Sequence, residues 1–156
     1  MTVSLWRIAV EAPAYAAGDM SGAGAKASGG RWNSPGTAMI YTSVNIALAA
    51  LETLSHIRTA ALPFNRYLVR IDVPASVWAL REPLDPLPGG WDAIPSGLAG
   101  RKAGDAWIAA ARSPMLVVPS VIVPEEHNVL INPMHPETKK ISATTAKRWH
   151  CDPRFF

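Results

Sequence analysis

The sequence predicts an α+β fold: a single compact domain with a mixed β core and flanking helices. Three observations support this prediction. Strand-like and helix-like segments follow one another without the regular strand–helix–strand order of a parallel sheet. The 156 residues amount to about one domain, and no linker long enough to separate two domains interrupts them. Hydrophobic residues make up 49% and charged residues 17%, a balance that excludes a disordered chain. We therefore expect residues 1–156 to fold as one domain.

Two strands and one helix are predicted in the first 58 residues. Residues 5–10 alternate in polarity, which is the period of a half-buried strand. Residues 39–42 predict a second, short strand. The hydroxyl of Thr42 or Ser43 is then expected to cap a helix over residues 44–58, where apolar side chains recur at helical spacing.

Residues 18–36, between these two strands, are rich in Gly, Ser and Ala. Such a composition disfavours regular structure and lets the backbone approach a ligand closely. The segment contains Gly29-Gly30 directly before Arg31, and we interpret it as a candidate functional loop. Taken alone, it would equally fit a plain mobile loop.

The clearest strand is predicted over residues 66–73, and Pro74 ends it. Residues 81–100 are rich in Pro and Gly and are expected to form irregular surface. Trp78 and Trp91 are expected to anchor this part of the chain to the core by packing.

A second helix is predicted over residues 102–112, and Ser113-Pro114 stops it. Residues 115–118 and 121–123 are apolar strand pieces separated by Pro119-Ser120. Residues 128–133 predict a further strand.

Several classes of protein are excluded by composition. No apolar run reaches ~18 residues, so a membrane span is not expected. The N-terminal residues lack a basic leader followed by an apolar stretch, so no signal peptide is predicted. The single cysteine, Cys151, excludes an internal disulfide and a zinc cage of cysteine pairs, and the four histidines lack metal-ligand spacing. We expect a cytoplasmic protein without a metal site.

The net charge of +3 is compatible with nucleic acid, an anionic small molecule or an acidic protein as partner. Cations occur singly apart from three adjacent pairs, which are typical of a solvated surface. The sequence contains no phosphate-binding Gly-x-x-x-x-Gly-Lys-Ser/Thr loop, no His-Glu-x-x-His zinc helix and no Gly-x-Ser-x-Gly nucleophile motif.

Glu52 is unusual because it lies inside the apolar run of the first helix, near the edge of its buried face. A carboxylate in such a place is costly unless something uses it. The alternative is an ordinary helix-edge glutamate paired with His56 or Arg58.

Glu52, Arg31 in the glycine-rich loop and Ser120 at a strand break form a trio that resembles the RES-domain family, named for its Arg, Glu and Ser. The resemblance extends from near Leu5 to the C-terminus. It is carried, in order, by Gly29-Gly30-Arg31-Trp32-Asn33-Ser34-Pro35-Gly36, Ile40-Tyr41-Thr42, Ala49-Ala50-Leu51-Glu52, Gly104-Asp105-Ala106-Trp107, Leu116-Val117-Val118-Pro119-Ser120, Asn128-Val129-Leu130-Ile131-Asn132-Pro133-Met134-His135-Pro136 and Asp152-Pro153-Arg154.

The resemblance implies a fold like that of ADP-ribosyltransferases and a toxin of a type II toxin–antitoxin pair that depletes cellular NAD⁺. NAD⁺ would be the substrate, no separate cofactor is implied, and the nicotinamide–ribose bond would be cleaved with water or phosphate as acceptor. The alternative implied by the same family is a protein ADP-ribosyltransferase. The sequence leaves the acceptor open because all three reactions share the first bond cleavage.

The residue types suit this chemistry. Cleavage of the N-glycosidic bond builds an oxocarbenium-like charge on the ribose, which a fixed carboxylate stabilises, and Glu52 is the candidate. The resemblance implies that Arg31 and Ser120 are catalytic residues together with Glu52. The guanidinium of Arg31 is suited to the diphosphate of NAD⁺. Ser120 is a candidate for the nicotinamide amide or a ribose, and Tyr41 for nicotinamide stacking or a ribose hydroxyl. Arg7 is a second candidate for phosphate or carboxylate binding.

Each of these assignments has a structural alternative. Tyr41 is also suited to core packing, Ser120 to satisfying backbone groups at a strand break, and Arg7 to a structural ion pair.

The implied partner is an antitoxin with a helix-turn-helix DNA-binding domain and a C-terminal part that blocks the active site. By analogy the toxin would form a homodimer inside a larger complex, without contacting DNA or a membrane itself. Two other classes stay open at this stage: a nucleic-acid-binding module that stacks bases on its six tryptophans, and a catalytically inactive interaction protein.

Overall fold

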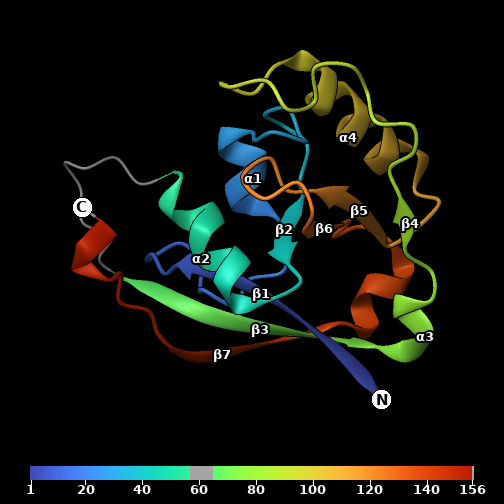
Figure 1. The fold of residues 1–156 in the computed structure, drawn as a ribbon. Coiled ribbons are helices and arrows are strands. Elements are labelled where there is room, and N and C mark those ends of the chain that lie inside the picture. The colour runs from blue at the N-terminus through green and yellow to red at the C-terminus, as the bar shows by residue number, and fades with distance from the viewer. Residues whose placement is uncertain (57–64, 156) are drawn as a thin grey trace.

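A mixed seven-stranded sheet forms the centre of the molecule, in a computed structural model that describes residues 1–56 and 65–155 (Figure 1). The strand order is β4-β5-β6-β2-β1-β3-β7, and only the β4–β5 pair is parallel. The predicted α+β class is therefore confirmed. The elements are β1 (Thr2–Val10), α1 (Ala23–Ser28), β2 (Ile40–Ser43), α2 (Ile46–Leu54), β3 (Arg66–Pro74), α3 (Ala75–Trp78), β4 (Glu82–Pro83), α4 (Leu98–Ala110), β5 (Met115–Pro119), β6 (His127–Ile131), η1 (Pro136–Lys140), β7 (Ser142–Arg148) and η2 (Pro153–Phe155).

The sheet carries a hydrophobic cluster on each of its faces, because successive side chains of a strand point to opposite sides. On β6, Val129 and Ile131 belong to the larger cluster, whereas Leu130 belongs to the smaller one. The larger cluster also takes Leu5 of β1 and Ile71 of β3, which are paired across the sheet. The two apolar sets explain why the central strands are rich in Val, Ile and Leu without a simple alternation.

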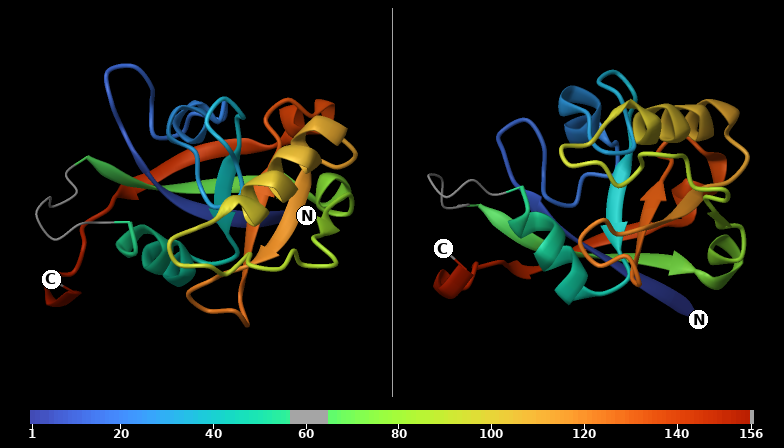
Figure 2. Two further views of the ribbon diagram at one scale, coloured as in Figure 1. Left: turned by 90° about the horizontal axis from the view of Figure 1, so that it is seen from above. Right: turned by 45° about the horizontal axis from the view of Figure 1, so that its top comes forward.

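Helices α2 and α4 cover different parts of the sheet (Figures 1 and 2). Helix α4 places Trp107 in the smaller cluster, against Leu116 of β5 and Leu130 of β6. Helix α2 contacts β1 and β2 instead. Trp91 packs against the smaller cluster and Trp78 against the larger one, so both predicted anchors are confirmed.

Helix α2 begins later than predicted. Its N-cap is Asn45, whose side chain accepts a hydrogen bond from the backbone N–H of Leu48 at 2.8 Å, so the expected caps Thr42 and Ser43 were wrong. These two residues extend β2, because their hydroxyls donate across the sheet to the Val129 carbonyl and to the Asn128 side chain. The helix ends at Leu54, and residues 57 and 58 of the predicted helix lie outside the described residues.

Other differences reflect tertiary contacts that local sequence does not carry. Residues 121–123 form a bend and not a strand. Helix α4 begins at Leu98, within the stretch predicted to be irregular. Its glycines lower helix propensity but allow close packing. The sequence also failed to predict helix α1 in the glycine-rich segment and the edge strand β7.

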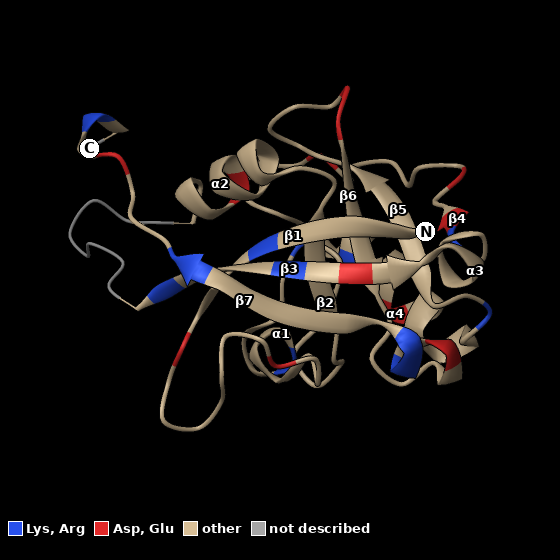
Figure 3. Ribbon diagram, turned by 90° about the horizontal axis from the view of Figure 1, so that it is seen from below, with Lys and Arg blue, Asp and Glu red and all other residues tan. Residues whose placement is uncertain are grey.

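Positive residues gather where β3 begins and β7 ends, and the rest of that face is mixed (Figure 3). Arg148 and Lys147 of β7 pair with Tyr67 and Leu68 of β3. Farther along β3, Asp72 forms an ion pair with Arg70 at 3.1 Å. The cations are thus interrupted and form no continuous stripe along this face. Within the described ranges, no helix has the length and apolar character needed to cross a membrane.

Candidate active site

The Glu52 carboxylate is held by two side chains from the sheet. Ser120 Oγ donates to Glu52 Oε1 at 2.7 Å, and Asn128 Nδ2 donates to the same oxygen at 2.8 Å. Glu52 is half-buried on α2, and Ser120 is fully buried at the end of β5. Two of the three residues expected to form the trio therefore meet directly, although they are 68 positions apart.

His56 is not the partner of this carboxylate. Its Nδ1 lies 2.7 Å from the backbone carbonyl oxygen of Glu52. The alternative of a helix-edge pair between the Glu52 carboxylate and His56 is therefore wrong. Arg58, the other suggested partner, lies outside the described residues.

The sequence interpretation missed Asn128 and Ser43. Ser43 Oγ donates to Asn128 Oδ1 at 2.7 Å, which fixes the amide so that its nitrogen faces Glu52. Ser43 and Asn128 are paired across β2 and β6, so their side chains share one face of the sheet. The available signal was a polar side chain directly before the apolar run Val129–Ile131 of β6.

Ser120 also organises the bend that follows it. Its Oγ accepts hydrogen bonds from the backbone N–H groups of Ile122 and Val123, both at 3.1 Å. Ser120 therefore has the structural role that the sequence suggested as an alternative. It satisfies backbone N–H groups at the strand break, and it also contacts Glu52. Both donors to Glu52 reach Oε1, and the described residues place no hydrogen bond on Oε2.

Among the described residues, the Arg31 side chain forms no hydrogen bond with Glu52 or Ser120. Its Nη1 donates to the backbone carbonyl oxygens of Trp91 at 2.8 Å and Ala93 at 2.9 Å. The guanidinium is therefore fixed at one end by the loop that precedes α4. The opposite edge, Nε and Nη2, has no hydrogen-bond partner among the described residues, and its parallel N–H groups have the geometry of a bidentate anion site.

Helix α4 packs closely against the turn of residues 30–33, which carries Arg31 and is called the Arg31 turn below. A Cβ added at Gly100 would lie 2.6 Å from the carbonyl oxygen of Arg31, and one added at Gly104 would overlap the carbonyl oxygen of Trp32. Asp105, the residue after Gly104, adds a hydrogen bond: its Oδ1 accepts from the backbone N–H of Ser34 at 2.9 Å. The glycine spacing on α4 therefore determines how closely the Arg31 turn approaches the helix.

Tyr41 holds the same turn from the sheet side. Its hydroxyl donates to Asn33 Oδ1 at 2.6 Å and accepts from the backbone N–H of Trp32 at 3.1 Å. A Cβ at Gly30 would lie 2.7 Å from this hydroxyl, so any larger residue there would displace the Tyr41 side chain. Burial raises the pKa of Tyr41 above its ordinary range, which keeps the hydroxyl protonated as a donor. We assign Tyr41 to positioning the Arg31 turn.

We expect Tyr41→Phe to lower the free energy of unfolding by about 1–2 kcal/mol, because Asn33 and the Trp32 N–H lose their partner. The raised pKa adds a pH signature. The neutral phenol favours the folded chain, so its contribution is complete below the unfolded pKa of about 10 and is lost as pH rises above it. Denaturation by urea from pH 7 to 11 measures this: the alkaline loss of stability should be smaller in the variant. An equal alkaline loss in both proteins contradicts the assignment.

Arg7 serves another part of the molecule. Its Nη2 donates to the backbone carbonyl oxygens of Ala17, at 2.7 Å, and Asp19. Trp6 pairs with Ser43, and neighbouring residues of a strand point to opposite faces, so Arg7 faces away from the Glu52 network. Burial lowers the pKa of Arg7, and the charge of Asp19 opposes that shift. We therefore retain the alternative that Arg7 has a structural role. Its partners are backbone carbonyl oxygens and not the carboxylate of an ion pair.

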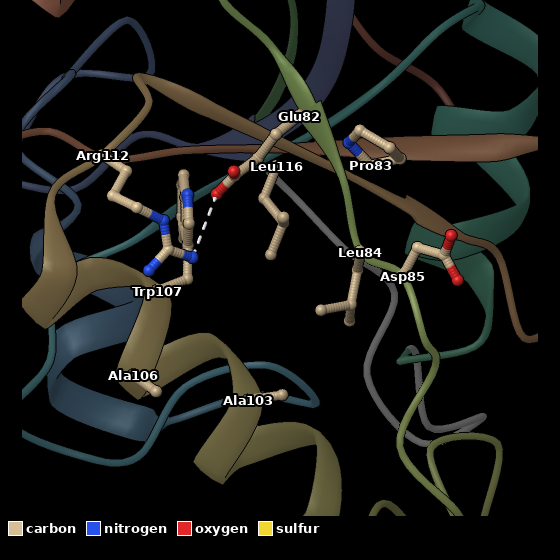
Figure 4. A pocket seen from close by; sticks show the side chains of 9 residues that line it. All are labelled: Glu82, Pro83, Leu84, Asp85, Ala103, Ala106, Trp107, Arg112 and Leu116. Atoms are coloured by element: carbon tan, nitrogen blue, oxygen red, sulfur yellow. Dashed lines mark ion pairs between the residues drawn. The ribbon is translucent and has the colours of Figure 1, made fainter.

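A separate pocket of about 240 Å³ lies between β4, α4 and β5 (Figure 4). Arg112 and Glu82 form an ion pair at its side, at 3.7 Å. The lining residues are Glu82, Pro83, Leu84, Asp85, Ala103, Ala106, Trp107, Arg112 and Leu116. None of the candidate residues lines it, so the candidate site is defined by the contacts of Glu52 and Arg31. Among the residues described here, no cluster of three His, Cys, Asp or Glu side chains is suited to a metal.

Comparison with known proteins supports the family resemblance. The model of a family described as the RES domain matches residues 4–153. A relative from Sphingobium sp. (strain YBL2), named Prs ADP-ribosylating toxin, is 52% identical over 156 residues, covering 99% of this chain and 97% of the relative. A relative from Photorhabdus laumondii, named Toxin Res, is 37% identical over 134 residues, covering 86% and 85% of the two chains.

A solved structure shows the same fold at low sequence identity. It is the crystal structure of the M. tuberculosis MbcT–MbcA toxin–antitoxin complex, in which the matched chain has a TM-score of 0.65 and 16% identity. The match covers 94% of this chain and 85% of that chain. The likeness to this structure supports the described fold, and the predicted resemblance to the RES-domain family is confirmed by the family model and the relatives.

Proposed function

Because the chain belongs to the RES-domain family of toxins, we propose that it cleaves the nicotinamide–ribose bond of NAD⁺ and transfers the ADP-ribose. The observation that carries this proposal is the fixed carboxylate of Glu52. Two neutral donors hold Oε1 and keep the side chain in one orientation without neutralising its charge. The other oxygen is left to face a ligand.

In the proposed reaction the bond between the nicotinamide nitrogen and the ribose C1″ breaks, and nicotinamide leaves with the electron pair. Positive charge develops on the ribose, and the negative Glu52 carboxylate stabilises it. Because Glu52 is already oriented by Ser120 and Asn128, little reorganisation is needed when the charge appears. A nucleophilic atom of the acceptor then forms a bond to C1″ and loses its proton to solvent, which completes the transfer.

For the acceptor we favour a protein side chain over water or phosphate. The support is the Sphingobium relative, which is 52% identical over nearly the whole chain and is named an ADP-ribosylating toxin. The sequence interpretation put NAD⁺ depletion first and protein modification second, so the relative changes that order. Hydrolysis stays as the second candidate because the Glu52 network is equally suited to water as the acceptor.

We further propose an antitoxin partner that restrains the enzyme. The structural neighbour was solved as a toxin–antitoxin complex, and an enzyme that consumes a central cofactor must be restrained in its own host. The proposed antitoxin covers the region between Glu52 and Arg31. Its helix-turn-helix domain and a toxin homodimer remain expectations from the family.

The test is a product analysis with the purified chain. The protein is incubated with NAD⁺ labelled in the adenylate, with and without a bacterial lysate, and nicotinamide, free ADP-ribose and labelled protein are quantified. We expect nicotinamide release, with label on a discrete protein band when lysate is present. Release with free ADP-ribose alone selects hydrolysis. Absence of nicotinamide release under all conditions contradicts the proposed function.

A further inference from the structure

Arg101 is a second arginine beside the Arg31 turn, and no role has been assigned to it above. It lies in the second turn of α4 and is half-buried. Its Nε donates to the carbonyl oxygen of Gly30 at 3.2 Å. This bond orients the guanidinium and leaves its two terminal nitrogens, which have no partner within the described ranges.

Arg31 and Arg101 share an unusual arrangement, since both are anchored by backbone carbonyls and neither has a carboxylate partner among the described residues. The ion pairs that the structure records all lie elsewhere. Asp105, one turn after Arg101, uses Oδ1 to accept from the Ser34 N–H. Two half-buried cations without a counter-ion are costly, unless an anion binds between them.

The backbone brings the segments that carry the two side chains into contact. Gly100 lies directly against the Arg31 carbonyl, so Arg101 and Arg31 begin from segments in contact. Both positive charges affect the pKa of the Tyr41 hydroxyl. Burial raises this pKa, and the positive charges of Arg101 and Arg31 each oppose that rise. Both positive charges are therefore near the Tyr41 hydroxyl, which itself contacts the backbone N–H of Trp32.

We propose that Arg101 binds the diphosphate of NAD⁺ together with Arg31, so that two guanidinium groups face the two negative charges of the ligand. The inference rests on the proposed function and adds a binding residue to it. A diphosphate favours two such planar donors because each presents parallel N–H groups to its oxygens.

The spacing of the site fits a ligand of this length. Tyr41, whose hydroxyl contacts the Arg31 turn, and Ser43, whose hydroxyl reaches Asn128 beside Glu52, lie on the same face of β2. Two residues along a strand span about 7 Å. In NAD⁺ the reacting ribose carbon and the diphosphate are separated by one sugar, so one molecule can bring its ribose to Glu52 and its diphosphate to the two arginines.

The experiment compares two substitutions of Arg101 that separate its positive charge from its Nε hydrogen bond to Gly30. Arg101→Gln places a neutral N–H donor where Nε lies and so keeps the bond to Gly30, but it removes the charge. Arg101→Lys keeps the charge and loses the Nε donor. Both are made in a Glu52→Gln background, and the dissociation constant of ADP-ribose is measured by calorimetry at low and high salt. Lys102→Gln, which removes an exposed charge from the next position of α4, is the matched control.

We expect Arg101→Gln to weaken ADP-ribose binding roughly tenfold and to reduce its salt dependence, with the melting temperature nearly unchanged. Arg101→Lys keeps the charge but not the parallel N–H groups, so it should recover part of the affinity that Arg101→Gln loses, and Lys102→Gln should bind as the parent does. The reverse ranking, with Gln as parent and Lys weakened, assigns Arg101 a purely structural role and overturns the inference while the proposed function stands. Absence of ADP-ribose binding in the Glu52→Gln parent contradicts the proposed function itself.

Discussion

Glu52→Gln is expected to lower kcat for nicotinamide release by at least about 10²-fold while leaving the fold intact. The amide oxygen of glutamine still accepts from Ser120 and Asn128, so the network that holds the side chain is retained. What the variant loses is the negative charge beside the ribose, which matters only as positive charge develops in the transition state. KM for NAD⁺ should therefore change much less than kcat.

Initial rates of nicotinamide release, together with a melting curve, measure this effect. We expect the free energy of unfolding to change by less than about 1.5 kcal/mol, because two hydrogen bonds to a charged acceptor become two to a neutral one. Glu125→Gln is the matched control, since Glu125 is exposed and outside the network. A Glu52→Gln enzyme with kcat within threefold of the parent would remove Glu52 from the chemistry.

Gly104→Ala is expected to have the largest effect on stability, lowering the free energy of unfolding by about 3 kcal/mol. The new methyl group would overlap the carbonyl oxygen of Trp32, which is backbone and cannot rotate away. Helix α4 and the Arg31 turn must separate to accommodate it. The midpoint of thermal unfolding should fall by about 10 °C, and kcat/KM of the folded fraction should fall as Arg31 moves.

Gly24→Ala is the matched control, because Gly24 also lies within a helix but a Cβ there has no neighbour within 4 Å. We expect this variant to melt at or slightly above the parent, since alanine has the higher helix propensity. Thermal unfolding followed by circular dichroism compares the two directly. Equal melting temperatures for Gly104→Ala and the parent would show that the contact between α4 and the turn is not tight in solution.

Much of the candidate site could be predicted from the sequence, because the residue types proposed to carry its chemistry are unusual in their local sequence. Glu52 is a carboxylate within an apolar helix, and Arg31 follows two glycines. Asn128 is less conspicuous, because asparagine near the start of a strand is common. Its role depends on Ser43, which lies 85 positions away and meets it only through the pairing of β2 with β6.

The sequence by itself determined the α+β class, the strands that build the core and the membership of the RES-domain family, because apolar periodicity and residue order are local properties. Only the tertiary structure decided that Ser120 binds Glu52, that Arg7 faces the other side of the sheet, and that α4 brings Arg101 to the Arg31 turn. These outcomes depend on strand register and on contacts between backbone segments far apart in the chain. A shift of one residue in the register of a strand would turn each of its side chains to the opposite face of the sheet. The composition of the chain does not determine that register.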